Sequence, residues 1–387
     1  MPAFQETTRP RDILVTGGTG FIGSHLAVRL LELGHRVHWL IRPHASSAER
    51  RMETMLERLV EDRALRQLYL SRSRALSGNI QLPNMGLPGC DRAALPVFEE
   101  VWHSAASLSF QEGEREEIFR TNLAGTKNLM AWLEQTPSRR VNFVSTAYIA
   151  GRRQGRVLES EIFTGQEFKN PYEESKCLSE LFIRECEARA GFQSTIFRPS
   201  VVIGRSDDGK ITHFHGVYGF IKGLATALCR INLRKELNGL IELPLRIVGA
   251  ASKTLNMVPV DYVIDAMISI GVGRNSLGKT YHVVNPVPPE NRVWLRELCR
   301  TLGVTGVRFV ADHEFQNSPM TFIEKLFSRK MAFYAQYLDG EPVFDTTNLG
   351  AALQGTGIEC PRLDKRMMQM IIQYYLQLLD LPRHVEA

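Results

Sequence analysis

Three side chains of this sequence carry the groups that reduction of a carbonyl requires. Thr146 follows a short apolar run, and Tyr172 stands four positions before Lys176 at the head of a helix-forming segment. Residues four apart share one face of a helix, so we expect the Lys176 ammonium to lower the pKa of the Tyr172 phenol. A phenol beside a threonine hydroxyl supplies a proton donor and a hydrogen bond to a developing oxyanion. Because Tyr-x-x-x-Lys occurs often in helices by chance, its meaning depends on the residues that precede it.

A glycine-rich motif precedes these residues and predicts a dinucleotide site. It has the spacing Gly-x-x-Gly-x-x-Gly at Gly17, Gly20 and Gly23, and it connects an apolar run at 13–15 to a helical pattern at 23–33. Gly17 makes the tight turn, Gly20 lets the backbone approach a diphosphate, and Gly23 allows the helix to pack closely on the strand. The phosphates then face the free N–H groups of the helix N-terminus. A glycine turn without a ligand is the alternative, and the strand-helix-strand order disfavours it.

The second strand ends at Arg42, and this residue indicates which dinucleotide is bound. A binder of NAD places Asp or Glu near this point to hold the ribose 2′-hydroxyl, whereas an arginine can meet a 2′-phosphate. The sequence therefore predicts NADPH. A solvated charge at the strand end is the alternative role of Arg42.

The order of the predicted elements indicates an α/β fold, a Rossmann-type doubly wound parallel sheet. Short β-branched runs alternate with helical patterns through about the first two hundred residues. We expect residues 1–205 to form the NADP(H)-binding domain that carries the catalytic Thr, Tyr and Lys. Residues 206–387 are expected to form a smaller, mainly helical substrate-binding and capping region, interleaved with late strands of the sheet near 255–286. Predicted strands lie at 13–15, 36–41, 75–80, 101–103, 141–144, 196–199 and 281–285.

Composition and charge exclude several other classes of protein. The 387 residues carry a formal net charge of +5 without a block of like charges, so no nucleic-acid partner is expected. Six cysteines lie scattered without a paired spacing, and no metal is implied. The first apolar run is too short for a signal peptide, and no stretch is long enough to span a bilayer. These features predict a soluble, cytoplasmic protein.

Together these motifs resemble the extended short-chain dehydrogenase/reductase superfamily over roughly residues 13–286. Within it the chain resembles the acyl reductase branch, which contains fatty acyl-CoA reductases, the reductase domains of carboxylic acid reductases, and thioester reductases of polyketide and peptide assembly lines. The narrower match rests on the helical insert before the third strand, on Gly78-Asn79-Ile80 with Asn84-Met85-Gly86-Leu87, on His103-Ser104-Ala105-Ala106 with Phe110, and on Val144-Ser145-Thr146-Ala147-Tyr148.

The resemblance implies roles for particular residues. Asn79, an Asp in many relatives, is expected near the adenine, Ala105 and Ala106 near the ribose and diphosphate, and Asn122 on a helix that supports the fifth strand. His103 is expected to be structural or to line the cofactor. Thr146, Tyr172 and Lys176 are the expected catalytic residues. The expected cofactor-binding residues are Thr16, Gly17, Gly20, Phe21, Ile22, Gly23, Arg42, Asn79, Ile80, Ser104, Ala105, Ala106, Asn122, Tyr172, Lys176, Arg198, Pro199 and Val201.

The resemblance also implies a reaction, namely reduction of an acyl thioester by NADPH to an aldehyde, with further reduction to the alcohol left open. The thioester is expected to arrive on coenzyme A or on a carrier protein in trans, and the chain to act as a monomer or homodimer. Two alternatives remain at this stage. One is a dehydrogenase, reductase or epimerase of the same superfamily that acts on a free ketone, alcohol, sterol or nucleotide sugar. The other is a regulatory NADP-binding protein without turnover.

Overall fold

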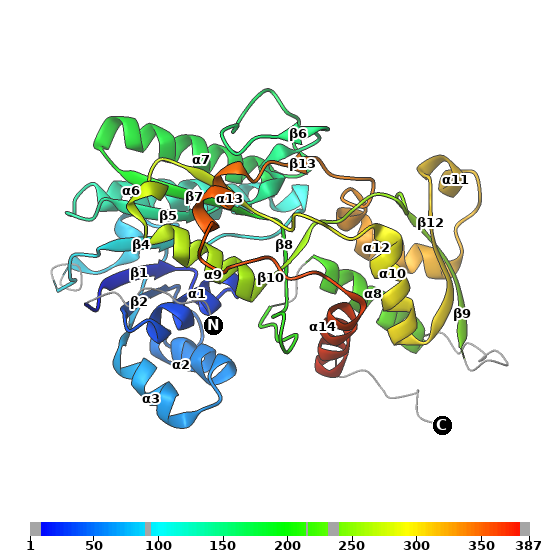
Figure 1. The fold of residues 1–387 in the computed structure, drawn as a ribbon, viewed down its shortest axis with the longest axis horizontal. Helices are drawn as coiled ribbons and strands as arrows, with labels where there is room; N and C mark the ends of the chain where they lie inside the picture. Colours follow the sequence, from blue (N-terminus) through cyan, green and yellow to red (C-terminus); the bar gives the residue numbers. More distant parts are fainter. Residues whose placement is uncertain (1–8, 90–93, 214–215, 231–239, 380–387) are drawn as a thin grey trace. The chain divides into compact units, whose positions relative to one another are not determined.

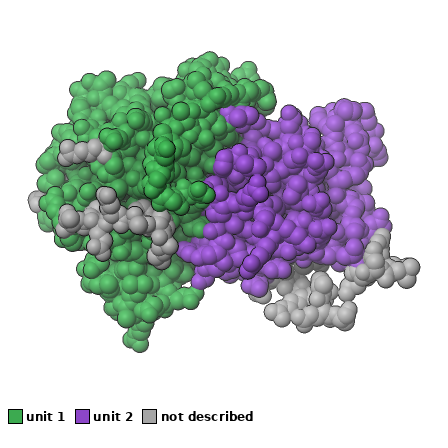
Figure 2. Space-filling model, viewed as in Figure 1, with its two compact units in different colours: residues 1–200, 260–284, 344–359 green, residues 201–259, 285–343, 360–387 purple. Residues whose placement is uncertain are grey.

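The computed structural model describes residues 9–89, 94–213, 216–230 and 240–379. It divides into two compact units, coloured separately in Figure 2, and the chain passes between them several times. Unit 1 comprises Met1–Ser200, Val260–Val284 and Phe344–Glu359, and unit 2 comprises Val201–Pro259, Asn285–Val343 and Cys360–Ala387.

Unit 1 is built on a seven-stranded sheet in which every neighbouring pair is parallel (Figure 1). The strand order is β11-β7-β5-β4-β1-β2-β3. The central strands are buried along nearly their whole length, and apolar residues predominate in them, because helices cover both faces of a parallel sheet. The strands are β1 (Asp12–Thr16), β2 (Arg36–Ile41), β3 (Ser73–Ser77), β4 (Glu100–His103), β5 (Arg140–Val144), β7 (Gln193–Pro199) and β11 (Thr280–Val283). This arrangement confirms the expected Rossmann-type fold.

Helices flank this sheet in two groups. Helix α1 packs against α9, whereas α5 and α6 each pack against α7. The insert before β3 forms the two helices α2 and α3, as its helical spacing indicates. The helices of unit 1 are α1 (Phe21–Glu32), α2 (Ala48–Leu59), α3 (Arg63–Ser71), α5 (Arg115–Phe119), α6 (Gly125–Leu133), α7 (Pro171–Ala190), α9 (Val260–Gly271) and α13 (Thr347–Leu353), with a π-helical turn at Arg120–Ala124 between α5 and α6.

The strand order reverses at β1, which pairs with β2 on one side and with β4 on the other. Open α/β sheets bind ligands at the carboxyl ends of the strands where the order reverses. The residues just beyond β1 and β4 meet here, since the Ser104 N–H donates to the Thr16 carbonyl at 3.2 Å. The topology therefore places the predicted cofactor site at the carboxyl ends of β1 and β4.

A late segment of the chain, Phe344–Glu359, returns to unit 1 and is fixed there by a buried carboxylate. Glu159 accepts hydrogen bonds from the backbone N–H groups of His282, Asn348 and Leu349. Two of these donors lie in the first turn of α13, where N–H groups lack partners within the helix. A short strand pair, β6 (Arg156–Val157) with β13 (Val343–Phe344), adds to the attachment.

Unit 2 contains helices and two short parallel strand pairs. The pair of β9 with β12 lies in the region expected to be mainly helical. β9 alternates buried and more exposed residues, which is the pattern of a half-buried strand. No helix in the described part of the chain is long and apolar enough to cross a bilayer. The elements are β8 (Val201–Ile203), α8 (Val217–Arg230), β9 (Ile241–Val248), β10 (Met257–Pro259), α10 (Asn291–Leu302), β12 (Val304–Val310), α11 (Asp312–Gln316), α12 (Phe322–Ala335) and α14 (Lys365–Leu378).

Candidate active site

The glycine turn lies directly against the loop that follows β4. A Cβ added to Gly17 would stand 2.6 Å from the backbone nitrogen of Ala105, and the φ of Gly17 is +74°. At Gly23 an added Cβ would stand 2.2 Å from the Gly17 carbonyl oxygen and 2.8 Å from Ser104 Oγ. At Gly20 it would meet only the Gly17 oxygen within 4 Å, at 3.2 Å, so the other side of the turn is open. The turn therefore has the close packing and the open backbone face that a diphosphate requires.

A pair of arginines stands beside this turn at the end of β2. Arg42 is exposed, and its carbonyl accepts a hydrogen bond from Arg51 Nη1 at 2.6 Å. Arg51 Nη2 reaches Thr19 Oγ1 of the glycine turn at 3.4 Å, and burial together with the Arg42 charge lowers the pKa of Arg51. Among the described residues, neither guanidinium has a carboxylate within salt-bridge distance. Two cations held together without an anion form a suitable site for a phosphate.

Arg51 was not identified from the sequence, although a signal for it is present. Its neighbour Arg50 pairs with Glu53 and Glu57 on the same helix. Arg51 has no carboxylate three or four positions away along the chain. An arginine that lacks a carboxylate partner on its own helix, close in sequence to the end of β2, is a candidate for binding an anionic ligand.

The residues expected near the adenine follow β3. Asn79 Oδ1 accepts from the Gln81 N–H at 3.0 Å, and the Asn79 N–H donates to the Met85 carbonyl at 2.7 Å. Met85 has a φ of +57°, in the left-handed region that non-glycine residues seldom adopt. Ile80 packs its side chain against Gly125 of α6, where an added Cβ would stand 2.8 Å away. The structure thus holds Asn79 and Ile80 in a fixed turn at the carboxyl end of β3.

The three expected catalytic side chains come together at the carboxyl end of β5. Thr146 lies just beyond that strand, and its side chain is hydrogen-bonded to the Tyr172 phenol. Lys176 is one turn further along α7, and its Nζ donates to the Val144 carbonyl at 2.7 Å. All three side chains are buried, and the Phe110 ring covers that of Tyr172 at 5.6 Å between centroids. Phe110 belongs to the loop after β4, so this loop contacts both the glycine turn and the phenol.

Burial controls the protonation of this group. It raises the pKa of Tyr172 above its usual value, and the hydrogen bond from Thr146 offsets this only in part. It lowers the pKa of Lys176 to about 7, against the attraction of Glu180 one turn along the helix. The expected lowering of the phenol pKa by Lys176 is not found, because the ammonium is directed to the Val144 carbonyl. A protonated phenol is the form that can donate a proton during reduction.

Asn122 supports the catalytic helix from the π-helical turn. Its Nδ2 donates to Ser175 Oγ at 2.9 Å, and that hydroxyl donates to the Tyr172 carbonyl at 2.8 Å. Its Oδ1 accepts from the Ser107 N–H at 2.7 Å. A π-helical turn leaves backbone groups out of the regular helical pattern, and such turns are frequent at functional sites. Asn122 therefore connects the loop after β4 to α7.

The Arg198 side chain, which the sequence predicts beside the cofactor, is surrounded by other residues of unit 1. Its guanidinium is fully buried and forms an ion pair with Glu180 at 2.6 Å. It also lies 3.3 Å from both the Glu159 carbonyl and His282 Nε2. Its side chain is thus occupied within unit 1, and only the adjoining backbone remains for a cofactor. Pro199 ends β7, Val201 begins β8 of unit 2, and the cofactor roles of these residues stay predictions.

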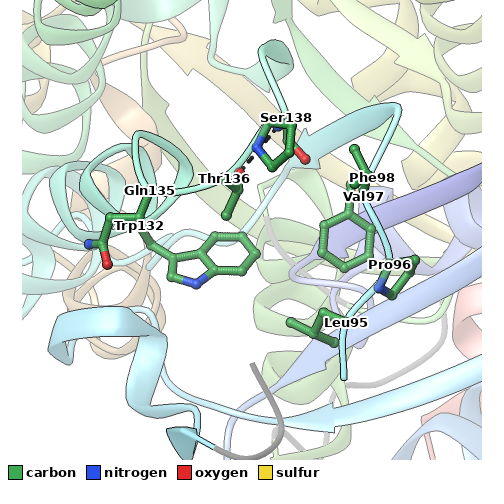
Figure 3. A pocket seen from close by; sticks show the side chains of 9 residues that line it. Leu95, Pro96, Val97, Phe98, Trp132, Gln135, Thr136 and Ser138 are labelled. Atoms are coloured by element: carbon green, nitrogen blue, oxygen red, sulfur yellow. Dashed lines mark hydrogen bonds between the residues drawn. The ribbon is translucent and has the colours of Figure 1, made fainter. Parts of the chain in front are cut away.

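A surface cavity of unit 1 is lined by two segments of the chain that precede β4 and β5 (Figure 3). Its lining comes from the segment before β4, from the last turn of α6 and from the turn that connects α6 to β5. Trp132 and Phe98 provide its aromatic surfaces. The expected catalytic side chains stand at the carboxyl ends of the strands, so this cavity does not coincide with the predicted site. Its lining residues are Leu95, Pro96, Val97, Phe98, Trp132, Gln135, Thr136, Pro137 and Ser138.

Among the described residues, no group of three or more His, Cys, Asp or Glu side chains is placed to hold a metal ion. The described cysteines are free thiols, and burial raises the pKa of Cys177 to about 12. A thiol of this kind is a poor nucleophile.

Several named proteins are similar to this chain in sequence. The chain is 26% identical over 94% of its length to a non-canonical nonribosomal peptide synthetase of Cladobotryum sp., of which it covers 36%. It is 24% identical over 86% of its length to a putative fatty acyl-CoA reductase of Drosophila melanogaster, of which it covers 65%. The chain thus spans about one third to two thirds of the length of these relatives.

The fold is shared with a solved reductase-type structure. The terminal R domain from the myxalamid PKS-NRPS biosynthetic pathway superposes with a TM-score of 0.78, at 24% sequence identity, over 97% of this chain and 93% of that one. Residues 15–267 match the family described as male sterility protein, an NAD-binding domain. The chain therefore belongs to the male sterility protein family, whose members are oxidoreductases of the extended short-chain dehydrogenase/reductase type.

Proposed function

We propose that this protein is an NADPH-dependent reductase that converts an acyl thioester to an aldehyde. The observation that carries the proposal is the buried Tyr172 phenol, hydrogen-bonded to Thr146 and held on α7 one turn before Lys176. Burial keeps the phenol protonated, which suits a group that must give a proton to a reduced substrate.

NADPH is preferred to NADH because of the arginine pair beside the glycine turn. The Arg51 guanidinium reaches Thr19, the Arg42 charge acts on it, and no described acidic side chain neutralises either group. A 2′-phosphate would supply the missing negative charge, whereas an unphosphorylated ribose would leave two cations close together. The resulting discrimination between the two cofactors is an electrostatic one.

The residues divide the chemistry as follows. The reduced nicotinamide, when bound, supplies the hydride that forms the new C–H bond at the thioester carbon. Thr146 and Tyr172 donate hydrogen bonds to the oxygen on which negative charge develops, and Tyr172 gives that oxygen its proton. Lys176 stabilises the phenolate that remains. When the hemithioacetal loses its proton, the C–S bond breaks and the thiolate leaves with the bonding electrons, so the products are an aldehyde and a thiol.

The thioester class is supported by the relatives rather than by a described pocket. One relative is a putative fatty acyl-CoA reductase, and another is a nonribosomal peptide synthetase. We propose that the acyl group is delivered on coenzyme A or on the phosphopantetheine of a carrier protein. Both carriers present the same thioester bond to Thr146 and Tyr172.

The test is turnover by the purified chain with NADPH and a panel of acyl-CoA and carrier-bound thioesters. Absorbance at 340 nm follows NADPH, and an aldehyde-trapping reagent identifies the product. Tyr172→Phe should remove turnover and retain NADPH binding, whereas Tyr69→Phe, a buried tyrosine of α3, should retain both. The proposal is wrong if no thioester is reduced while a ketone or nucleotide sugar is turned over, or if NADPH binds and no substrate of any class reacts.

A further inference from the structure

A buried histidine connects the cofactor cradle to the helix that carries the catalytic phenol. His103, the last residue of β4, is 1% exposed. Its Nδ1 lies 2.7 Å from Thr16 Oγ1, at the start of the glycine turn, and its Nε2 lies 2.9 Å from Thr126 Oγ1 on α6. A histidine bonded at both nitrogens within the protein has no site left for a substrate. Any effect of His103 on the reaction is therefore exerted through Thr16 and Thr126.

The directions of the two hydrogen bonds of His103 follow from the Asn122 carbonyl, which can only accept. Thr126 Oγ1 donates its proton to the Asn122 carbonyl at 2.6 Å, so it can only accept from His103. His103 Nε2 therefore carries the proton. Burial and the Lys176 charge lower the pKa of His103 to about 3, so the ring is neutral and Nδ1 is an acceptor. Thr16 Oγ1 must then donate to Nδ1, which leaves it free to accept from the Ala105 N–H at 3.4 Å.

The chain of hydrogen bonds continues from Asn122 to the catalytic helix. The Asn122 side chain donates to Ser175 Oγ, and Ser175 Oγ donates to the carbonyl of Tyr172. The same side chain bonds both the N–H and the carbonyl of Ser107 in the loop after β4. One path therefore connects Ala105, which packs on Gly17, to the backbone of Tyr172.

We propose that His103, as the neutral tautomer protonated at Nε2, is a positioning residue that fixes the cofactor cradle relative to the catalytic helix. The Thr16 hydroxyl donates only to His103, and the Thr126 hydroxyl donates only to the Asn122 carbonyl, so the hydrogen bonds of the path have a single set of directions. When the hydrogen bond between His103 and Thr126 is lost, Asn122 is held less firmly. Helix α7 can then shift, and the Tyr172 phenol moves with respect to the bound cofactor. Misplacement of reacting groups by about 1 Å can lower turnover by about a hundredfold. The kinetic consequence rests on the proposed function, whereas the tautomer does not.

The tautomer can be measured without any substrate. Nitrogen-15 NMR of the histidine-labelled full chain, assigned by comparison with His103→Phe, should show His103 as a neutral ring with its proton on Nε2. The signals should stay unchanged between pH 5 and pH 9, with and without NADPH. A ring that is protonated at Nδ1, or that titrates within this range, would overturn the inference whether or not the chain reduces thioesters.

Kinetics of two matched variants test the positioning role. Thr126→Val keeps the shape of the side chain and removes the hydroxyl between His103 and Asn122, whereas Thr126→Ser keeps that hydroxyl. We expect Thr126→Val to lower kcat by about tenfold or more, with less than a threefold change in the Kd of NADPH. Thr126→Ser should restore kcat. Equal kcat values for both variants and the wild type would refute the inference, as would a loss that follows the melting temperature alone and is not restored by serine.

Discussion

Binding of NADPH should be accompanied by uptake of a proton at Lys176. In the free protein this side chain is 2% exposed, and burial lowers its pKa to about 7. Its only hydrogen-bond acceptor among the described residues is the Val144 carbonyl, and the Phe143 ring lies 4.5 Å from Nζ, so two of the three ammonium protons have no hydrogen-bond acceptor there. Ribose hydroxyls and a nearby diphosphate would provide acceptors and negative charge, which favour the charged form. Cofactor binding should therefore return the pKa toward its ordinary value near 10.5.

The size of the uptake follows from these two values. At pH 8 a group of pKa about 7 is about nine-tenths uncharged, so binding should take up about 0.9 proton per site. At pH 6 the same group is already charged, and the uptake at Lys176 should fall to about 0.1 proton. The sign of the pH dependence is fixed: the affinity for NADPH should decrease as the pH rises above 7, by up to about tenfold per pH unit.

Isothermal titration calorimetry measures this quantity directly. The heat of NADPH binding is measured at pH 8 in buffers of different ionisation enthalpy, and the slope gives the number of protons taken up. Lys176→Met should reduce the uptake close to zero, whereas Lys127→Met, an exposed lysine of α6, should leave it unchanged. The reasoning is refuted by an uptake below about 0.2 proton in the wild type, or by an equal uptake in Lys176→Met.

Three further perturbations have defined outcomes. In steady-state assays, Arg51→Ala should raise the KM for NADPH by about ten- to a hundredfold and leave the KM for NADH nearly unchanged. Arg50→Ala should change neither KM, because Arg50 is paired with carboxylates on its own helix. Gly17→Ala should abolish NADPH binding in fluorescence titrations, because the new Cβ would stand 2.6 Å from Ala105 N, at a φ of +74° that costs about 1 kcal/mol by itself. Gly113→Ala should bind NADPH normally, because a Cβ added there has no atom within 4 Å. Glu159→Gln should lower the free energy of unfolding by about 2 to 3 kcal/mol in urea titrations, since an amide cannot accept from all three backbone N–H groups. An unchanged unfolding midpoint would contradict the role of the Glu159 carboxylate in fixing the segment Phe344–Glu359.

The site depends on local signals that the sequence carries and on distant contacts that it does not. The glycine turn, Arg42 and the Tyr172–Lys176 spacing could be recognised because their geometry is set within a few residues by a turn, a strand end or one helical turn. Arg51 and the Phe110 ring were missed as site residues because their partners lie on other segments of the chain. The strand β9 was missed because a short alternating run within a helical region gives a weak signal.

The fold class and the family were determined by the sequence alone, because the alternation of strand and helix and the glycine spacing are local patterns with one common solution. The protonation of the catalytic groups was decided only by the tertiary structure. Burial sets whether the Tyr172 phenol holds its proton and whether Lys176 is charged, and burial depends on every segment packed around them. The same holds for His103, whose tautomer is fixed by hydroxyl groups from β1 and α6 that only folding brings to the two sides of its ring.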